Sequence, residues 1–320
     1  MKMLKLLSVC IALVICSGMG YSGSKVQAAE APQDKKAILV VSFGTTYADA
    51  RKANIESVAN KISKTFPGYD VRMAFTSRII LKKIADRDGI KIDTEKQALN
   101  RLKAEGYSEV IVQPLHMIPG EEYDKVNSLV AQYAHDKAFA KIELGRPIFD
   151  YTGQEEKPDD YQIAIDALKT QLPKLANKEA VVFMGHGGVH PANTAYAALQ
   201  LRFQDAKLKN VFVFAVDGEG YPTLDSVVEK LKEQKINKVT LMPLMLVAGD
   251  HATNDMAGDE KDSAKSVLLQ AGFKVETYLH GLGENGAIQD IYVQHVKDAM
   301  EGKYNRHERG KDRPEIPVID

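Results

Sequence analysis

The chain carries the same segment twice, and this repeat limits the folds that it can adopt. Residues 110–122 are VIVQPLHMIPGEE, and residues 239–251 are VTLMPLMLVAGDH. In a second pair, 37–45 (AILVVSFGT) and 180–188 (AVVFMGHGG), an apolar run enters a glycine turn. Two similar halves bring the ends of equivalent strands together. The repeat therefore predicts a pseudo-twofold arrangement with a cleft between the halves.

Short apolar runs alternate with helical patterns along the whole chain, which is typical of parallel βα units. The length of 320 residues also favours two domains over one. The predicted strands are 37–42, 71–75, 110–115 and 141–144 in the first half, and 180–184, 211–216, 238–244 and 275–279 in the second. The sequence therefore predicts an α/β fold with about four parallel strands in each half, joined by a linker near 151–160.

The first 28 residues are expected to be a signal peptide. A basic start precedes the apolar run 6–15, which is too short to span a bilayer, and 26–28 (VQA) fits a cleavage site. The mature protein is then expected outside the cytoplasm, in the periplasm or another extracytoplasmic space. Both cysteines, Cys10 and Cys16, lie in this segment. Any metal site in the mature chain must therefore use His, Asp or Glu.

Charge and hydropathy exclude two classes of partner. Cleavage would remove three of the 42 basic residues and none of the 43 acidic ones, so the mature chain would be acidic. Because no basic stripe is present, nucleic acid is not an expected partner. The mature chain has no second long apolar run, so no membrane span is expected in it.

Three side chains follow predicted strands at the turns where open parallel sheets bind ligands. They are Glu122, His186 and His251, and one carboxylate with two imidazoles suits a divalent first-row metal. Each also has a structural interpretation. Glu122 would be favoured in the first turn of a helix, His186 could be a turn histidine or part of an esterase-like oxyanion loop, and His251 could simply follow a capping Asp250. The acidic neighbours of His251 could also orient its imidazole.

The other histidines are less informative. His116 lies in an apolar segment and is expected to be a core histidine with satisfied hydrogen bonds, whereas His190 lies in the glycine-rich turn and is a candidate for contact with substrate. His135, His280 and His295 have no supporting constellation. His307 falls in the charged segment 302–320, which we expect to be a disordered tail.

Taken together, these segments resemble the anaerobic sirohydrochlorin cobaltochelatases of the class II chelatase superfamily, which also includes ferrochelatase. The likeness covers about residues 36–300. The motifs that carry it are VVSFGT (40–45), AFTS (74–77), RDGIKID (87–93), PLH (114–116), GEEY (120–123), VFMGHG (182–187), LMPLMLVAGDHA (241–252), NDM (254–256) and GLGEN (281–285).

The resemblance implies two Rossmann-like domains with four-stranded parallel sheets related by pseudo-twofold symmetry, over 36–150 and 160–284. It implies a terminal helix, 285–300, that packs on the first domain. It also implies that His186, His251 and Glu122 hold the metal, and we take His186 as the favoured proton acceptor. Family members commonly form homo-oligomers.

The expected function is therefore an exported chelatase that inserts Co(II), or Fe(II), into sirohydrochlorin or a related tetrapyrrole during cobalamin or porphyrin biosynthesis. The divalent metal is a substrate; nickel would also fit the ligands, and no organic cofactor is expected. The expected tetrapyrrole contacts are Phe43, Gly44, Thr45, Met117, Ile118, Gly187 and His190. The alternative is an exported binding protein that carries haem, another tetrapyrrole or a metal ion.

Overall fold

The computed structural model describes residues 34–217 and 220–304, and these fall in one compact unit. The expected signal peptide and residues 305–320 of the expected tail lie outside the described residues. Residues 302–304 are described, and the ring of Tyr304 lies 5.0 Å from the guanidinium of Arg146. No helix in the described part of the chain is long and apolar enough to cross a membrane.

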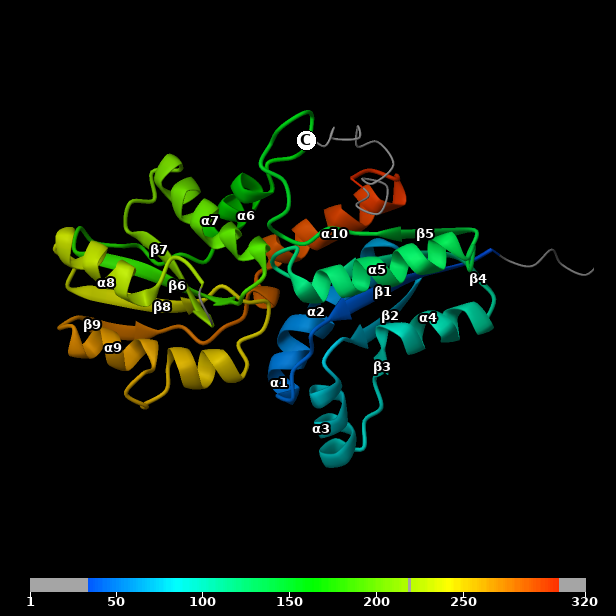
Figure 1. The fold of residues 1–320 in the computed structure, drawn as a ribbon, viewed down its shortest axis with the longest axis horizontal. Coiled ribbons are helices and arrows are strands. Elements are labelled where there is room, and N and C mark those ends of the chain that lie inside the picture. The colour runs from blue at the N-terminus through cyan, green and yellow to red at the C-terminus, as the bar shows by residue number, and fades with distance from the viewer. Residues whose placement is uncertain (1–33, 218–219, 305–320) are drawn as a thin grey trace, which may run out of the picture. The chain divides into compact units, whose positions relative to one another are not determined.

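The first sheet has five parallel strands in the order β3-β2-β1-β4-β5 (Figure 1). Four strands were predicted; the additional β3 has only two residues, too few to show an apolar pattern. The elements of this half are β1 (Lys35–Ser42), α1 (Ala48–Ala50), η1 (Arg51–Glu56), α2 (Ser57–Thr65), β2 (Asp70–Phe75), α3 (Arg78–Asp88), β3 (Asp93–Thr94), α4 (Glu95–Ala104), β4 (Tyr107–Pro114), α5 (Glu121–His135) and β5 (Lys141–Leu144).

The second sheet has four parallel strands in the order β7-β6-β8-β9, which repeats the order β2-β1-β4-β5 of the first. The predicted α/β class with two parallel sheets is confirmed. The remaining elements are α6 (Asp160–Lys169), β6 (Glu179–Gly187), η2 (Pro191–Asn193), α7 (Thr194–Asp205), β7 (Val211–Asp217), α8 (Leu224–Glu233), β8 (Lys238–Pro243), η3 (Ala252–Met256), α9 (Ala264–Gln270), β9 (Lys274–Thr277), η4 (Leu282–Glu284) and α10 (Gly286–Met300).

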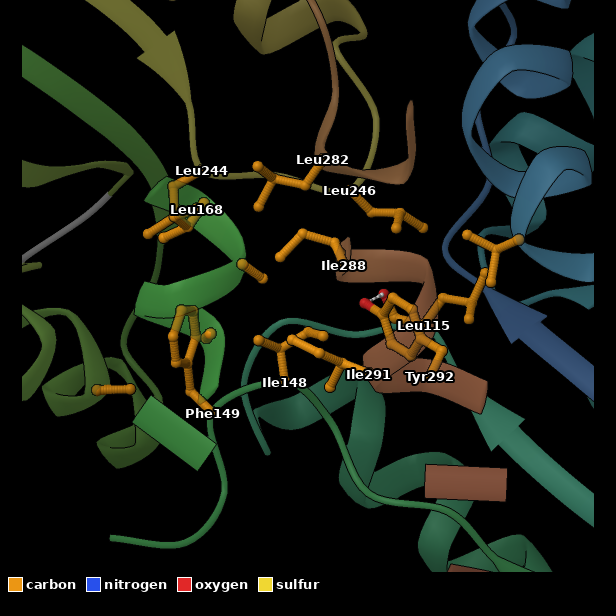
Figure 2. Close-up of a cluster of buried hydrophobic side chains, with 14 of the residues drawn as sticks. Leu115, Ile148, Phe149, Leu168, Leu244, Leu246, Leu282, Ile288, Ile291 and Tyr292 are labelled. Atoms are coloured by element: carbon orange, nitrogen blue, oxygen red, sulfur yellow. Dashed lines mark hydrogen bonds between the residues drawn. The ribbon is translucent and has the colours of Figure 1, made fainter. Parts of the chain in front are cut away.

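One hydrophobic cluster joins the two halves. It contains Ile38 of β1 and Phe183 of β6, and the terminal helix α10 packs against α2, β4 and α6. Figure 2 shows Leu115, Leu244 and Tyr292 in this cluster. The Tyr292 hydroxyl donates a hydrogen bond to the Leu115 carbonyl at 3.1 Å. The terminal helix therefore fixes the backbone where β4 ends.

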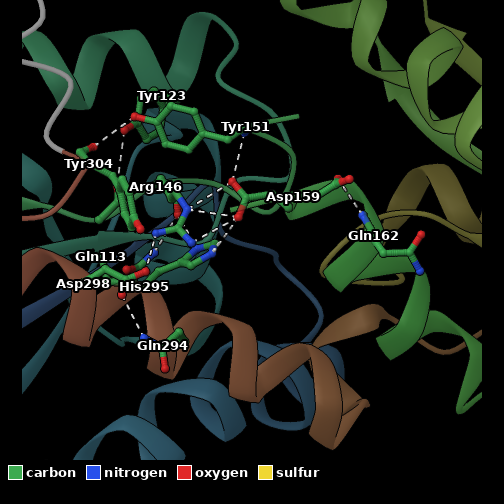
Figure 3. A network of polar contacts seen from close by, with 12 residues as sticks. Gln113, Tyr123, Arg146, Tyr151, Asp159, Gln162, Gln294, His295, Asp298 and Tyr304 are labelled. Carbon is green, nitrogen blue, oxygen red and sulfur yellow. Dashed lines mark hydrogen bonds and ion pairs between the residues drawn. The ribbon is translucent and has the colours of Figure 1, made fainter. Parts of the chain in front are cut away.

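A buried ion network attaches the linker and the terminal helix to the first sheet (Figure 3). Arg146, which follows β5, contacts Asp160 of α6 at 3.1 Å and Asp298 of α10 at 2.5 Å. The Nδ1 atom of His295 lies 2.9 Å from the Arg146 carbonyl oxygen. Loss of one partner would leave a buried charge unpaired, so these contacts hold the three segments in a fixed arrangement.

Candidate active site

A cavity of about 800 Å³ lies where the carboxyl ends of the strands from both halves meet. Its walls come from the segments that follow β1 and β4 in the first half, and β6 and β8 in the second. Every predicted site residue lines it: Phe43, Gly44, Thr45, Met117, Ile118, Glu122, His186, Gly187, His190 and His251. Parallel sheets place their ligands at this edge, so the cavity is the candidate active site.

The imidazoles of His186 and His251 meet on one wall of the cavity. Their ring centroids are 4.6 Å apart and the ring planes are inclined by 77°. The two residues come from the ends of different strands, β6 and β8, which are neighbours in the sheet. Two imidazoles this close can share one cation.

The two glycines that flank His186 are favoured for different reasons, Gly185 by packing and Gly187 by its backbone conformation. A Cβ atom on Gly185 would lie 2.3 Å from the ring of Tyr196, and Gly187 has a φ of 91°. Backbone hydrogen bonds from Gly187 and His186 to Tyr196 partly oppose the effect of burial, which raises the pKa of Tyr196 to about 12. Tyr196 therefore braces the end of β6, while the His186 side chain remains exposed to the cavity. The sequence pattern placed Tyr196 on a helix face and gave no sign of this contact.

His251 is oriented by a carboxylate one turn further along the chain. It precedes the short π-helix η3, and its Nδ1 atom lies 2.6 Å from the Asp255 carboxylate. A carboxylate in this position favours a proton on Nδ1, which leaves the lone pair of Nε2 for a metal. This contact fits the predicted role of the acidic neighbours.

Glu122 lines the cavity but does not join the two histidines. It lies in the first turn of α5, and its carboxylate is 2.8 Å from the Lys125 ammonium. Burial acts to raise its pKa, but hydrogen bonds, chiefly from Lys125, lower it below the ordinary value. Within 34–217 and 220–304 no three His, Cys, Asp or Glu side chains form a group that could hold a metal ion. The predicted three-residue ligand set is therefore not assembled here.

His116 is not the satisfied core histidine that the apolar segment predicted. Both of its ring nitrogens are buried, and neither has a hydrogen-bond partner. Burial lowers the pKa of His116 to about 4. The residue lines the cavity on the wall built by the first half. The absence of hydrogen-bond partners for this ring could be seen only in the three-dimensional structure.

Two contacts join the halves at the rim of the cavity. The Tyr47 hydroxyl lies 3.3 Å from the Asp250 carboxylate. His190 caps η2 through Nδ1, and its Nε2 atom lies 3.3 Å from the Asp124 carboxylate of α5. His190 therefore has a structural role besides its place in the cavity wall.

Comparison with known proteins assigns the chain to a family. Residues 36–301 match the family model described as cobalt chelatase (CbiK). A sirohydrochlorin cobaltochelatase from Salmonella typhimurium is 43% identical over 266 residues, which cover 83% of this chain and 97% of that protein. The sirohydrochlorin cobaltochelatase CbiKC from Nitratidesulfovibrio vulgaris is 34% identical over 84% of this chain and 92% of its own length.

Among solved structures, SirB from Bacillus subtilis with Fe3+ shares the fold. The match has a TM-score of 0.59 at 17% identity and covers 85% of this chain and 99% of that one. At this identity the likeness supports the architecture of two parallel sheets and nothing finer.

Proposed function

Because the chain belongs to the cobalt chelatase (CbiK) family, we propose that it inserts Co(II) into sirohydrochlorin. The single observation that carries this proposal is the His186–His251 pair on the wall of the cavity. A cavity of about 800 Å³ is large enough for a flat macrocycle, since ligand pockets commonly measure roughly 300–1,000 Å³. The two relatives named as sirohydrochlorin cobaltochelatases support the choice of metal and ring.

In this proposal His186 and His251 hold the cobalt ion as it arrives. Neutral imidazoles are good ligands for Co(II), and Asp255 presents His251 in the required tautomer. The ion is a substrate and must leave again, so a small ligand set is an advantage. Glu122 can add a third ligand only if its carboxylate leaves Lys125.

Insertion requires two pyrrole nitrogens to lose their protons. Each N–H bond breaks, its electron pair stays on nitrogen and becomes a bond to cobalt, and two protons leave for each ion inserted. His186 is the first proton acceptor in this scheme, because its imidazole becomes free as it releases the metal. Phe43, Met117 and Ile118 contact the ring face, while the amides of Gly44 and Thr45 receive peripheral carboxylates.

The test is an absorption assay with purified protein, sirohydrochlorin and Co(II), compared with the spontaneous rate. We expect catalysed insertion that is lost in His186→Ala and in His251→Ala. A rate no higher than the spontaneous one would refute the chelatase. Tight haem binding without turnover would support a carrier in its place. Parallel assays with Fe(II) and Ni(II) determine the metal, because His and carboxylate ligands accept all three ions.

We also propose that the enzyme acts outside the cytoplasm. Its support is the basic and apolar start of the chain and the VQA site at 26–28, which precede the family match at residue 36. Cell fractionation followed by N-terminal sequencing tests it. A mature chain that begins near residue 29 is expected, and an uncleaved cytoplasmic chain would contradict export.

A further inference from the structure

The backbone around His116 is held by hydrogen bonds, and both nitrogens of its imidazole are unpaired. Its carbonyl oxygen accepts a hydrogen bond from the Ile148 amide at 3.3 Å, and the carbonyl of Met117 accepts one from the Phe149 amide at 2.8 Å. On the other side, the carbonyl of Leu115 is held by Tyr292. The backbone is thus fixed at three consecutive residues, so rotation of the side chain is the motion left to bring a ring nitrogen to a partner in the cavity.

An unpaired imidazole is costly in a protein interior. Burial removes its hydration without a compensating hydrogen bond, and native structures leave few polar groups in that state. The equivalent residue of the second half, Met245, carries no such group and lines the same cavity. An apolar residue is therefore compatible with this turn, and the unpaired imidazole in its place points to a ligand.

His116 presents its partner with a neutral ring. Burial lowers its pKa to about 4, and the negative charge of Glu122 only partly opposes that shift. At neutral pH one ring nitrogen therefore donates a hydrogen bond and the other accepts one. A carboxylate of the ligand is a poor match, because Glu121 and Glu122 also line this wall. A neutral N–H donor fits better.

The proposed substrate carries such donors. A metal-free tetrapyrrole has N–H groups at its centre, and a ring in the cavity has His186 and His251 on the wall of the second half and His116 on that of the first. We propose that His116 is a substrate-binding residue whose imidazole accepts a hydrogen bond from a pyrrole N–H of the metal-free ring. This inference rests on the proposed function and deepens it.

The contact would distinguish substrate from product. Insertion replaces the central protons with cobalt, so the metallated ring has no N–H left to donate. The hydrogen bond then stabilises the complex with the metal-free ring alone. His116 would favour uptake of the substrate and, by the loss of this contact, release of the product.

The test measures binding of the two rings separately. Wild type, His116→Met and His116→Asn are titrated with sirohydrochlorin without metal and with cobalt-sirohydrochlorin. We expect His116→Met to weaken binding of the metal-free ring about tenfold, the effect of one lost hydrogen bond, and to change binding of the cobalt form less than about twofold. His116→Asn, whose side-chain oxygen also accepts, should restore part of the affinity.

Thermal melting controls for folding. Because His116→Met removes an unpaired buried polar group, its melting temperature should equal or exceed that of wild type. Equal affinity of wild type and His116→Met for the metal-free ring would overturn the inference while leaving the proposed function intact. An equal loss for both rings would also overturn it, since it would indicate packing or axial ligation of cobalt. If wild type binds neither ring, the proposed function and the inference both fail.

Discussion

The two halves face the cavity at three equivalent backbone positions with different side chains. The first half places Phe43, His116 and Glu122 where the second places His186, Met245 and His251. The backbones at these positions agree closely. Gly44 and Gly187 have φ values of 97° and 91°. The Leu115 and Leu244 amides each donate to the adjacent strand, to Val41 and Met184, at 2.7 Å.

The difference between the halves is therefore chemical. The second half contributes two imidazoles in contact, which suit a metal ion. The first half contributes an exposed phenyl ring and one buried, unpaired imidazole, which suit a flat organic ligand. A repeated backbone thus carries chemically different side chains on the two sides of the cavity, which under the proposed function serve as a metal wall and a ring wall.

The helices that follow β4 and β8 also differ between the two halves. Glu122 lies in α5, a helix of 15 residues, and pairs with the Lys125 cation. His251 precedes η3, which has five residues, and pairs with the Asp255 anion. The same turn therefore pairs a carboxylate with a cation in one half and an imidazole with an anion in the other.

The largest effect is expected when the second half is made like the first at the position of His186. His186→Phe copies Phe43 and removes one of the two imidazoles. We expect Co(II) insertion to fall by more than about 100-fold, beyond the loss usual for residues that only support a ligand. Initial rates and calorimetric Co(II) binding measure it.

The exposed Val189 on the same turn supplies the control, and Val189→Ala should stay close to the wild-type rate. If His186→Phe retained more than a tenth of the wild-type rate, the division into a metal wall and a ring wall would be wrong.

The sequence predicted the parts of this arrangement that follow from repetition and periodicity. Apolar runs located both sheets, and the position after each strand placed His186 and His251 in one cavity. Contacts between side chains were not predictable in the same way. The pairing of Glu122 with Lys125 depends on rotamers within one helical turn. Whether the His116 ring finds a hydrogen-bond partner depends on its neighbours in three dimensions. The apolar segment around it therefore led to the wrong prediction of a core histidine with satisfied hydrogen bonds.

The second effect is on the free energy of unfolding at acid pH. The substitution His116→Met, which makes the first half like the second at this position, tests it. The pKa of His116 is about 4 in the folded chain and 6.5 without burial. Between these values the unfolded chain binds more protons, so folding loses stability as the pH falls. The expected loss is about 3 kcal/mol of unfolding free energy from pH 7 to pH 4.

His116→Met should lack this component. Urea unfolding of both proteins across that range measures the difference and cancels the contribution of buried His295, which both retain. Parallel pH dependences of the two proteins would show that His116 is not a buried neutral group in solution.

A smaller loss of activity or metal affinity is expected when the contacts of His251 and Glu122 are changed. Asp255→Asn leaves His251 in place but removes its orienting carboxylate, and such changes cost about 10- to 100-fold in metal affinity.

Glu122→Gln should reduce the insertion rate less than about tenfold, because this carboxylate is paired with Lys125 and lies outside the histidine pair.

Lys125→Met separates the two interpretations of Glu122. It removes the paired ammonium, so Co(II) should bind more tightly if Glu122 can become a third ligand, and with unchanged affinity if it cannot. A loss in Glu122→Gln as large as that in His186→Phe would mean that the carboxylate leaves Lys125 when the metal arrives. The ion would then be held by both halves, and the contrast between the two walls would describe only the empty cavity.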